Sequence, residues 1–133
     1  MRVPVLLLAL TGLAAPVFAE TPGDFLAAYA QDAKTGNPAL GRLSAKRGQQ
    51  FFAQTHGRDW SCSSCHTRNP AASGKHAVTS RVIEPLAPAA NPARFTRASK
   101  VEKWFKRNCN DVLGRECTAQ EKGDVLSYLL TLR

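Results

Sequence analysis

Apolar side chains recur at helical spacing in four segments of the chain. The first predicted helix begins at Thr21, an N-cap followed by a proline and an early acidic residue, and ends at the helix-breaking residues 36–38. A second helix begins near Ser44, carries Gly48 and the aromatic pair after it, and ends at Gly57. The apolar face of the first helix consists of Phe25, Leu26, Tyr29 and Ala33.

Two more helices are predicted in the last third of the chain. Each begins with a capping box, in which a hydroxyl residue stands three positions before a glutamate. The boxes are Ser99 with Glu102 and Thr118 with Glu121. The stripes expected to face inward are Val101, Trp104, Phe105, Asn108 and Val112 on one helix, and Val125, Leu126, Tyr128, Leu129 and Leu130 on the other.

Residues 67–98 form a long, proline-containing stretch, and no alternation typical of a strand occurs in it or elsewhere. A loop of that length is unusual in a compact domain unless it surrounds something other than protein. We therefore predict an all-α fold, without strands, in which this stretch wraps a bound cofactor. The 133 residues suffice for one domain, and 44% hydrophobic with 21% charged residues is a globular composition, not a disordered one.

The N-terminus has the features of a secretory signal peptide. Arg2 precedes an apolar run over residues 3–15, and residues 17–19 have the small or apolar side chains of a cleavage site. A membrane anchor is the alternative, but the run is shorter than the ~18–20 residues of a spanning helix. We expect cleavage after Ala19, which leaves a single domain, residues 20–133, in the periplasm, where cysteine pairs oxidise.

The strongest motif is Cys62-Ser-Ser-Cys65-His66, the attachment signature for haem c. Two thiols at this spacing add to the two vinyl groups of one porphyrin edge, and the next residue places its imidazole under the iron. A thiol–disulfide oxidoreductase would need a βαβ context, which is not predicted. A zinc site would need a second ligand pair, and only Cys109 and Cys117 remain. We expect one covalent haem c.

The ligand on the other face of the iron is restricted by composition. The only methionine is Met1, which cleavage removes, so a His/Met centre is excluded. The remaining options are His56 or His76, a lysine, another oxygen or nitrogen donor, or an open site. His56 is six residues before Cys62, too close to the attachment edge, and is expected to be a turn residue.

Asn108 is the better candidate for the distal face. It lies on the inward stripe of the third predicted helix, and a buried amide without partners costs roughly 1–3 kcal/mol. The alternative is that backbone groups satisfy it. Cys109 follows directly, and in the periplasm it is expected to close a disulfide with Cys117 that fixes the height of Asn108. Trp104 and Phe105 are candidate haem-pocket residues, although core packing is favoured for Trp104.

Two patterns resemble class I cytochromes c. Gly48 with Phe52 four residues later resembles their N-terminal helix, and residues 124–129 resemble their C-terminal helix. The resemblance implies that the glycine lets these helices cross closely while Phe52 packs toward Tyr128 and Leu129.

The segments 74–78, 83–88 and 103–109, with Cys117, are similar to the SHP family (sphaeroides haem protein) of high-spin monohaem cytochromes c, also catalogued as a domain of unknown function. The resemblance covers about residues 24–132. It implies haem attachment at the cysteine–histidine motif, a Cys109–Cys117 disulfide and Asn108 as sixth iron ligand. It also implies release of that ligand on reduction, binding of O2, NO or CO, and a dihaem cytochrome c or membrane cytochrome b as electron partner.

Hard–soft chemistry also favours release of Asn108 on reduction, because an amide oxygen binds ferric iron better than ferrous iron. We expect an electron-transfer protein whose reduced iron binds diatomic ligands. Two alternatives stay open: a haem enzyme or sensor acting on an oxygen or nitrogen species, and a bis-His electron carrier that uses His76.

The formal charge of +8 is concentrated near the third predicted helix. Lys100, Lys103, Lys106 and Arg107 could form a docking face for an acidic redox partner, with Arg94 and Arg97 just before them. The alternative is an ordinary solvated helix face. Nucleic acid is not expected as a partner of an exported haem protein, and a monomer is expected.

Overall fold

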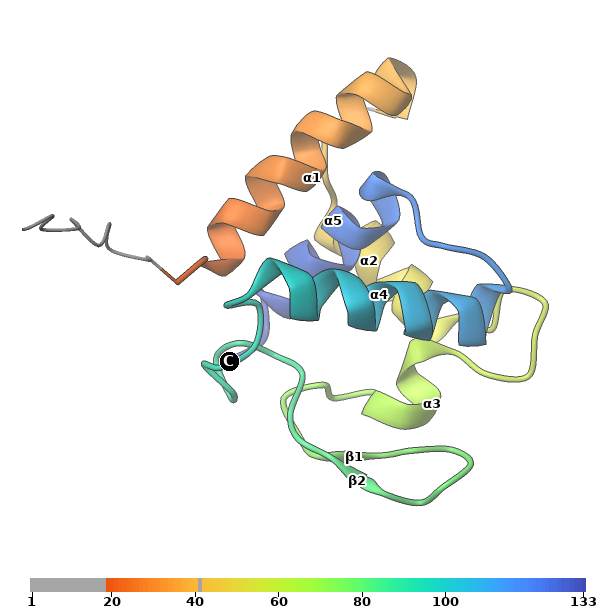
Figure 1. The fold of residues 1–133 in the computed structure, drawn as a ribbon. Coiled ribbons are helices and arrows are strands. Elements are labelled where there is room, and N and C mark those ends of the chain that lie inside the picture. The colour runs from red at the N-terminus through yellow and green to blue at the C-terminus, as the bar shows by residue number, and fades with distance from the viewer. Residues whose placement is uncertain (1–18, 41) are drawn as a thin grey trace, which may run out of the picture.

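The computed structural model describes residues 19–40 and 42–133, so the predicted signal peptide lies outside it except for Ala19. The elements are α1 (Pro22–Gly36), a 3-10 turn η1 (Pro38–Leu40), α2 (Ala45–Ala53), α3 (Cys62–His66), β1 (Gly74–Lys75), β2 (Val82–Ile83), α4 (Ala98–Leu113) and α5 (Ala119–Leu129). Figure 1 shows α3 and the strands at one end of the molecule and α1 at the other. None of the helices described is long and apolar enough to cross a membrane.

The predicted starts of α1 and α5 are confirmed. The Thr21 hydroxyl accepts the N–H of Asp24 at 3.3 Å, and the Asp24 carboxylate accepts the N–H of Thr21 at 2.7 Å. Thr118 and Glu121 make the same pair of bonds at 3.2 and 2.8 Å. These reciprocal bonds satisfy N–H groups that a helix start leaves without partners.

The predicted end of α2 at Gly57 is wrong, since the helix ends at Ala53. His56, at φ 53°, folds its ring back over Phe51, with ring centroids 4.3 Å apart. Its Nε2 lies 2.8 Å from the Phe51 carbonyl oxygen, one of the acceptors that the helix end leaves open. The turn is therefore fixed by the His56 side chain, in agreement with the expectation that His56 is a turn residue. Gly57 lies beyond the end of the helix.

The predicted capping box of α4 is also wrong. The helix begins at Ala98, after Arg97, which contributes no side-chain cap. The carboxylate of Glu20 accepts the N–H of Ala98 instead. Glu102 turns away from the helix start because two partners on other helices bind it.

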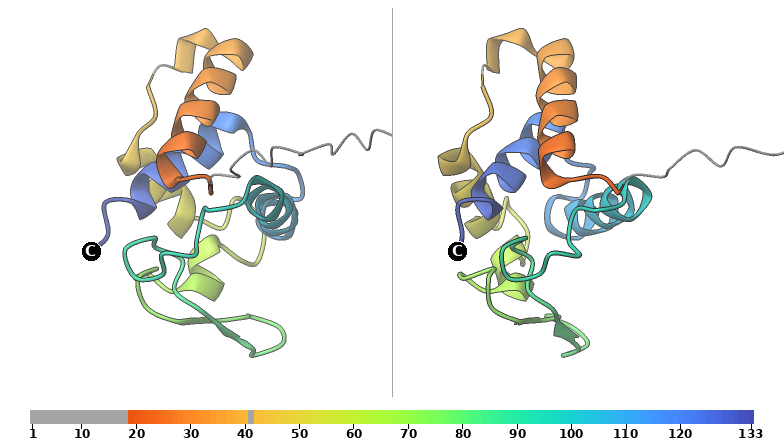
Figure 2. Two further views of the ribbon diagram at one scale, coloured as in Figure 1. Left: turned by 60° about the vertical axis from the view of Figure 1, so that its left-hand side comes forward. Right: turned by 90° about the vertical axis from the view of Figure 1, so that its left-hand side faces the viewer.

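The core is centred on the crossing of α2 and α5. A Cβ at Gly48 would lie 1.9 Å from the carbonyl oxygen of Asp124, so the two backbones touch as the resemblance to class I cytochromes implied. Phe52 packs on Tyr128 with ring centroids 5.7 Å apart, and Leu126 and Leu129 are fully buried beside them. The helix α1 lies across α5, as the two views in Figure 2 show.

The stretch 67–98 is not wholly irregular, and the prediction of no strand is wrong in one place. The strands β1 and β2 form an antiparallel pair with Gly74 opposite Ile83 and Lys75 opposite Val82. Two residues in each strand are too few to produce an alternating pattern that a sequence could reveal. The architecture remains all-α in its core.

Candidate haem site

The helix α3 is a single short turn that carries the cysteine–histidine motif. The N–H of Ser61 donates to the Ser64 hydroxyl at 3.0 Å and fixes the start of the turn. Neither Cys62 nor Cys65 takes part in a disulfide. Because they are three residues apart on a helix, they lie on the same side of it, and His66 follows directly.

The surroundings of α3 set the protonation of its side chains. Burial against the hydrophobic core, with a smaller contribution from Cys65, raises the pKa of the Cys62 thiol to about 12. Burial and then the charge of Arg94 lower the pKa of His66 to about 4. The imidazole is therefore neutral near pH 7, the form that binds a metal. Its ring lies 6.2 Å from that of Phe52.

The stretch after α3 folds back onto it. Gly74 approaches so closely that a Cβ there would lie 2.1 Å from the Cys65 carbonyl oxygen. The N–H of Ala77 donates to the Cys65 sulfur at 3.3 Å. Further along, Arg94 donates to the carbonyl oxygens of Glu84 and Pro85 at 2.7 and 2.9 Å, which anchors the second half of the stretch.

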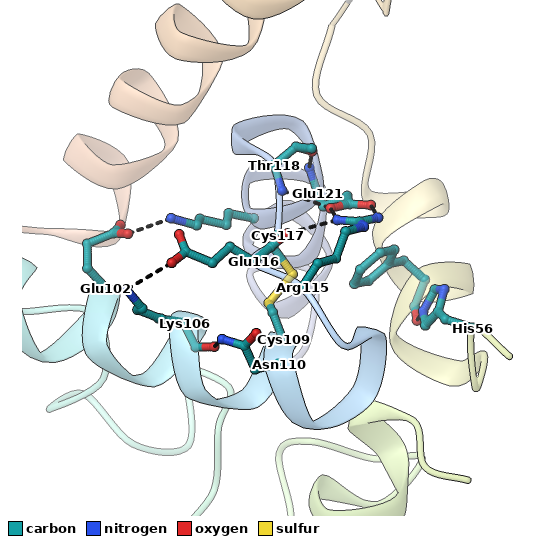
Figure 3. The surroundings of a disulfide bond; sticks show 12 residues. His56, Glu102, Lys106, Cys109, Asn110, Arg115, Glu116, Cys117, Thr118 and Glu121 are labelled. Carbon is teal, nitrogen blue, oxygen red and sulfur yellow. Dashed lines mark hydrogen bonds and ion pairs between the residues drawn. A yellow bond between two sulfur atoms is a disulfide. The ribbon is translucent and has the colours of Figure 1, made fainter. Parts of the chain in front are cut away.

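One flank of α4 is fastened to α1 and α5. Glu102 accepts from the Tyr29 hydroxyl at 2.6 Å and from the Lys122 ammonium at 2.5 Å. Burial alone would raise the pKa of Glu102, but these hydrogen bonds, first from Lys122 and then from Tyr29, outweigh it and lower the pKa. On the same flank, the expected disulfide joins Cys109 to Cys117 (Figure 3).

The other flank of α4 carries Trp104 and Asn108. Asn108 is half-buried, and its amide makes no hydrogen bond to any residue in the part of the chain that the structure describes. By contrast, the amide of Asn110 donates to the Lys106 carbonyl at 2.8 Å (Figure 3). At 3.6 residues per turn, Asn108 points about 100° away from Cys109 and the fastened flank.

Trp104 is not part of the protein core, contrary to the packing role favoured from the sequence. Its side chain is 42% exposed, and the Arg107 guanidinium lies 5.6 Å from its ring centroid. Phe105 instead enters an aromatic cluster, 6.0 Å from Tyr29 and 6.4 Å from Phe95. Trp104 therefore offers an apolar surface beside Asn108.

The remaining histidine, His76, lies in the loop between β1 and β2. Its Nδ1 accepts the backbone N–H groups of Val78 at 3.3 Å and Thr79 at 3.1 Å. With Nδ1 acting as an acceptor, the neutral ring carries its proton on Nε2. The loop is next to Cys65, through Ala77.

These residues fit a covalent haem. Two cysteine sulfurs on one side of a helical turn with a neutral imidazole next to them match the chemistry of haem c attachment and iron ligation. Within the described ranges, no group of three or more His, Cys, Asp or Glu side chains is arranged to hold a bare metal ion.

Comparison with known proteins identifies the family. A family model described as "Domain of unknown function (DUF1924)" matches residues 38–129. Cytochrome c'' of Methylophilus methylotrophus is 43% identical over 107 residues, which are 77% of this chain and 74% of the relative. Cytochrome c-type protein SHP of Cereibacter sphaeroides is 42% identical over 123 residues, 88% of this chain and 90% of the relative. The chain belongs to the SHP family of monohaem c-type cytochromes.

Solved structures of both relatives share the fold of this SHP-family chain. Oxidised SHP, described as an oxygen-binding cytochrome c, superposes with a TM-score of 0.73 at 38% identity, over 85% of this chain and 98% of that one. The solution structure of cytochrome c'', described in terms of haem-ligand detachment, gives a TM-score of 0.71 at 40% identity, over 83% and 92%. The predicted class I cytochrome c fold is confirmed, and the cofactor is one covalent haem c.

Proposed function

We propose that this cytochrome is an exported electron-transfer protein with a ligand-binding iron that opens on reduction. Cys62 and Cys65 hold the haem through their sulfurs, and His66 supplies the proximal ligand. Asn108 supplies the sixth ligand in the oxidised protein only. When bound, the haem provides one-electron redox chemistry and an iron with an axial position available to ligands.

The observation that carries this proposal is the state of the Asn108 amide. It is half-buried and without a hydrogen-bond partner among the described residues, on the flank of α4 that is not fastened to α1 and α5. Because none of the described residues binds the Asn108 amide, its oxygen lone pair is available to a metal ligand site on this flank of α4. The disulfide at Cys109 and the hydrogen bonds of Glu102 hold the helix, and therefore the amide, at a constant height.

The release of Asn108 on reduction is expected because its donor atom is an amide oxygen. The Asn108 oxygen is a hard donor, so it would bind ferric iron more strongly than ferrous iron. On reduction the Asn108 side chain would rotate away while α4 stays in place, and O2, NO or CO could bind beside Trp104, whose exposed ring offers an apolar surface. The descriptions of the two relatives, one oxygen-binding and one with ligand detachment, support carrying this behaviour over.

A bis-His centre through His76 is less well supported. To bind iron through Nε2, His76 would have to move its proton to Nδ1 and give up both backbone hydrogen bonds that Nδ1 accepts. The Ala77–Cys65 bond also ties its loop to the attachment side of the haem site.

Azide binding to the ferric protein tests the role of Asn108. In Asn108→Ala the distal position has no internal ligand, so we expect azide to associate at least about tenfold faster than in the wild-type protein. Asn110→Ala is the matched control, since that amide bonds only to the Lys106 carbonyl on its own helix. Equal azide kinetics and equal ferric absorption spectra in all three proteins would refute ligation by Asn108.

We also propose export to the periplasm with cleavage after Ala19, which gives a monomeric domain of residues 20–133. Mass spectrometry of the mature protein tests the cleavage site.

The partner would be an acidic redox protein, such as a dihaem cytochrome c or a membrane cytochrome b, steered by the cations of α4. Lys100, Lys103 and Arg107 are exposed, whereas Lys106 is already paired with Glu116 at 2.9 Å and contributes less.

A further inference from the structure

The β1–β2 hairpin carries the two most exposed large apolar side chains among the residues that the structure describes. Val78 is 64% exposed and Val82 is 71% exposed. Lys75 and Arg81 are exposed on the same hairpin, and Arg68 is exposed in the segment before it. Apolar side chains surrounded by polar or charged ones are typical of a transient protein interface.

Along the sequence, the charged residues of the hairpin and of the segment before it have one sign. From residue 60 to residue 83 the sequence contains three cations, Arg68, Lys75 and Arg81, and no acidic residue. The first carboxylate after the hairpin is Glu84, which contributes to the environment of Arg94. The hairpin therefore complements an acidic surface.

The hairpin is also fixed in shape. His76 Nδ1 accepts two N–H groups of the loop, and its carbonyl oxygen accepts the N–H of Ser80 at 2.9 Å. The His76 N–H in turn donates to the Arg81 carbonyl at 2.8 Å. A surface held in one conformation loses little entropy when a partner binds to it.

The hairpin lies directly against the haem-attachment residues. Gly74 touches the Cys65 carbonyl, and the Ala77 N–H donates to the Cys65 sulfur. Because electron transfer slows steeply with distance, a donor must approach close to an edge of the haem. A protein seated on this hairpin would contact the segment that touches Cys65, one of the two haem-attachment cysteines.

We propose that the hairpin of residues 74–83 is the contact surface for an acidic one-electron redox protein, which passes its electron beside Cys65. His76 organises this surface and is not an iron ligand. The inference rests on haem attachment at Cys65. In each encounter the partner loses one electron and the iron(III) becomes iron(II), with no bond formed or broken in the protein chain. The cations of α4 attract the partner from a distance, and the hairpin makes the contact.

Stopped-flow reduction of the ferric holoprotein tests this proposal. The probe is flavodoxin hydroquinone, an acidic one-electron donor, and dithionite serves as the small-molecule donor. For Val78→Ser/Val82→Ser we expect a second-order rate constant with flavodoxin about tenfold lower, with dithionite unchanged. Leu130→Ser, at a 39% exposed position at the end of α5, is the matched control and should keep the wild-type rate.

Charge variants test the rim of the surface. The double variant Lys75→Gln/Arg81→Gln should lower the rate constant for reduction by flavodoxin at low salt. It should also weaken the salt dependence of that rate constant, and both effects should be larger than in the double variant Lys34→Gln/Lys46→Gln. That control removes the same number of charges at exposed positions of α1 and α2. Equal salt dependence in the two double variants would contradict the proposal.

Substitution of His76 distinguishes a role in holding the shape of the hairpin from a role as an iron ligand. Asn places an oxygen acceptor at the same covalent position as Nδ1, so His76→Asn should retain the wild-type flavodoxin rate, while His76→Leu should lower it severalfold. Both variants should keep wild-type ferric spectra. A spectral change in both would instead indicate iron ligation by His76 and overturn this inference. If the wild-type iron binds its ligands as proposed but Val78→Ser/Val82→Ser reacts with flavodoxin at the wild-type rate, the hairpin is not the contact surface. The proposed function would be unaffected by that result.

Discussion

Gly74 joins the hairpin to the haem motif, and its replacement by alanine is the most informative single change. The new Cβ would lie 2.1 Å from the Cys65 carbonyl oxygen and 3.0 Å from the His66 Cα, and all these neighbours are backbone atoms that cannot rotate away. Carbon and oxygen atoms normally come no closer than about 3.3 Å, so the hairpin must retreat by about 1 Å. The bond from the Ala77 N–H to the Cys65 sulfur, now 3.3 Å, would be broken.

We expect Gly74→Ala to lower the free energy of unfolding by about 2 kcal/mol, within the range for overpacked sites. Urea unfolding of the ferric holoprotein, followed by circular dichroism and haem absorbance, measures this. Gly36→Ala is the control, because no atom lies within 4 Å of its Cβ position, and it should be neutral or slightly stabilising. A loss of less than about 0.5 kcal/mol in Gly74→Ala would contradict the close contact between Gly74 and the Cys65 carbonyl oxygen.

Three further predictions concern the fold. In Gly48→Ala the Cβ would lie 1.9 Å from the α5 backbone, and thermal unfolding should show a loss of about 3 kcal/mol or more. Cys109→Ser/Cys117→Ser removes a loop constraint and should cost about 2–3 kcal/mol in urea unfolding. The lowered pKa of Glu102 means that its ionised form stabilises the fold at neutral pH, and that this contribution is lost as the pH falls through the folded pKa. Glu102→Gln should therefore lose less stability than the wild-type protein between neutral pH and about pH 3.

Local chemistry explains what the sequence could predict. The cysteine–histidine motif, the caps at Thr21 and Thr118 and the helical stripes depend on residues within a few positions of one another. The contact of Gly48 with α5 was predictable only because a glycine at that place resembles a known helix crossing. The class of cofactor follows from the motif and agrees with the family.

Long-range contacts explain what the sequence could not predict. Glu102 is three residues after Ser99, which suggests a capping box, but Tyr29, 73 positions earlier, and Lys122, 20 positions later, bind its carboxylate instead. The end of α2 depends on a histidine ring folding back onto Phe51, a contact with no sequence signature. The exposure of Trp104 likewise depends on which flank of α4 is fastened to the other helices.

The central claim is that reduction frees the distal position of the iron. The most direct test is the absorption spectrum of the reduced wild-type protein with and without carbon monoxide. The account predicts a high-spin, five-coordinate ferrous spectrum that converts fully on addition of carbon monoxide. A ferrous protein that remains low-spin and does not bind carbon monoxide would contradict the release of Asn108.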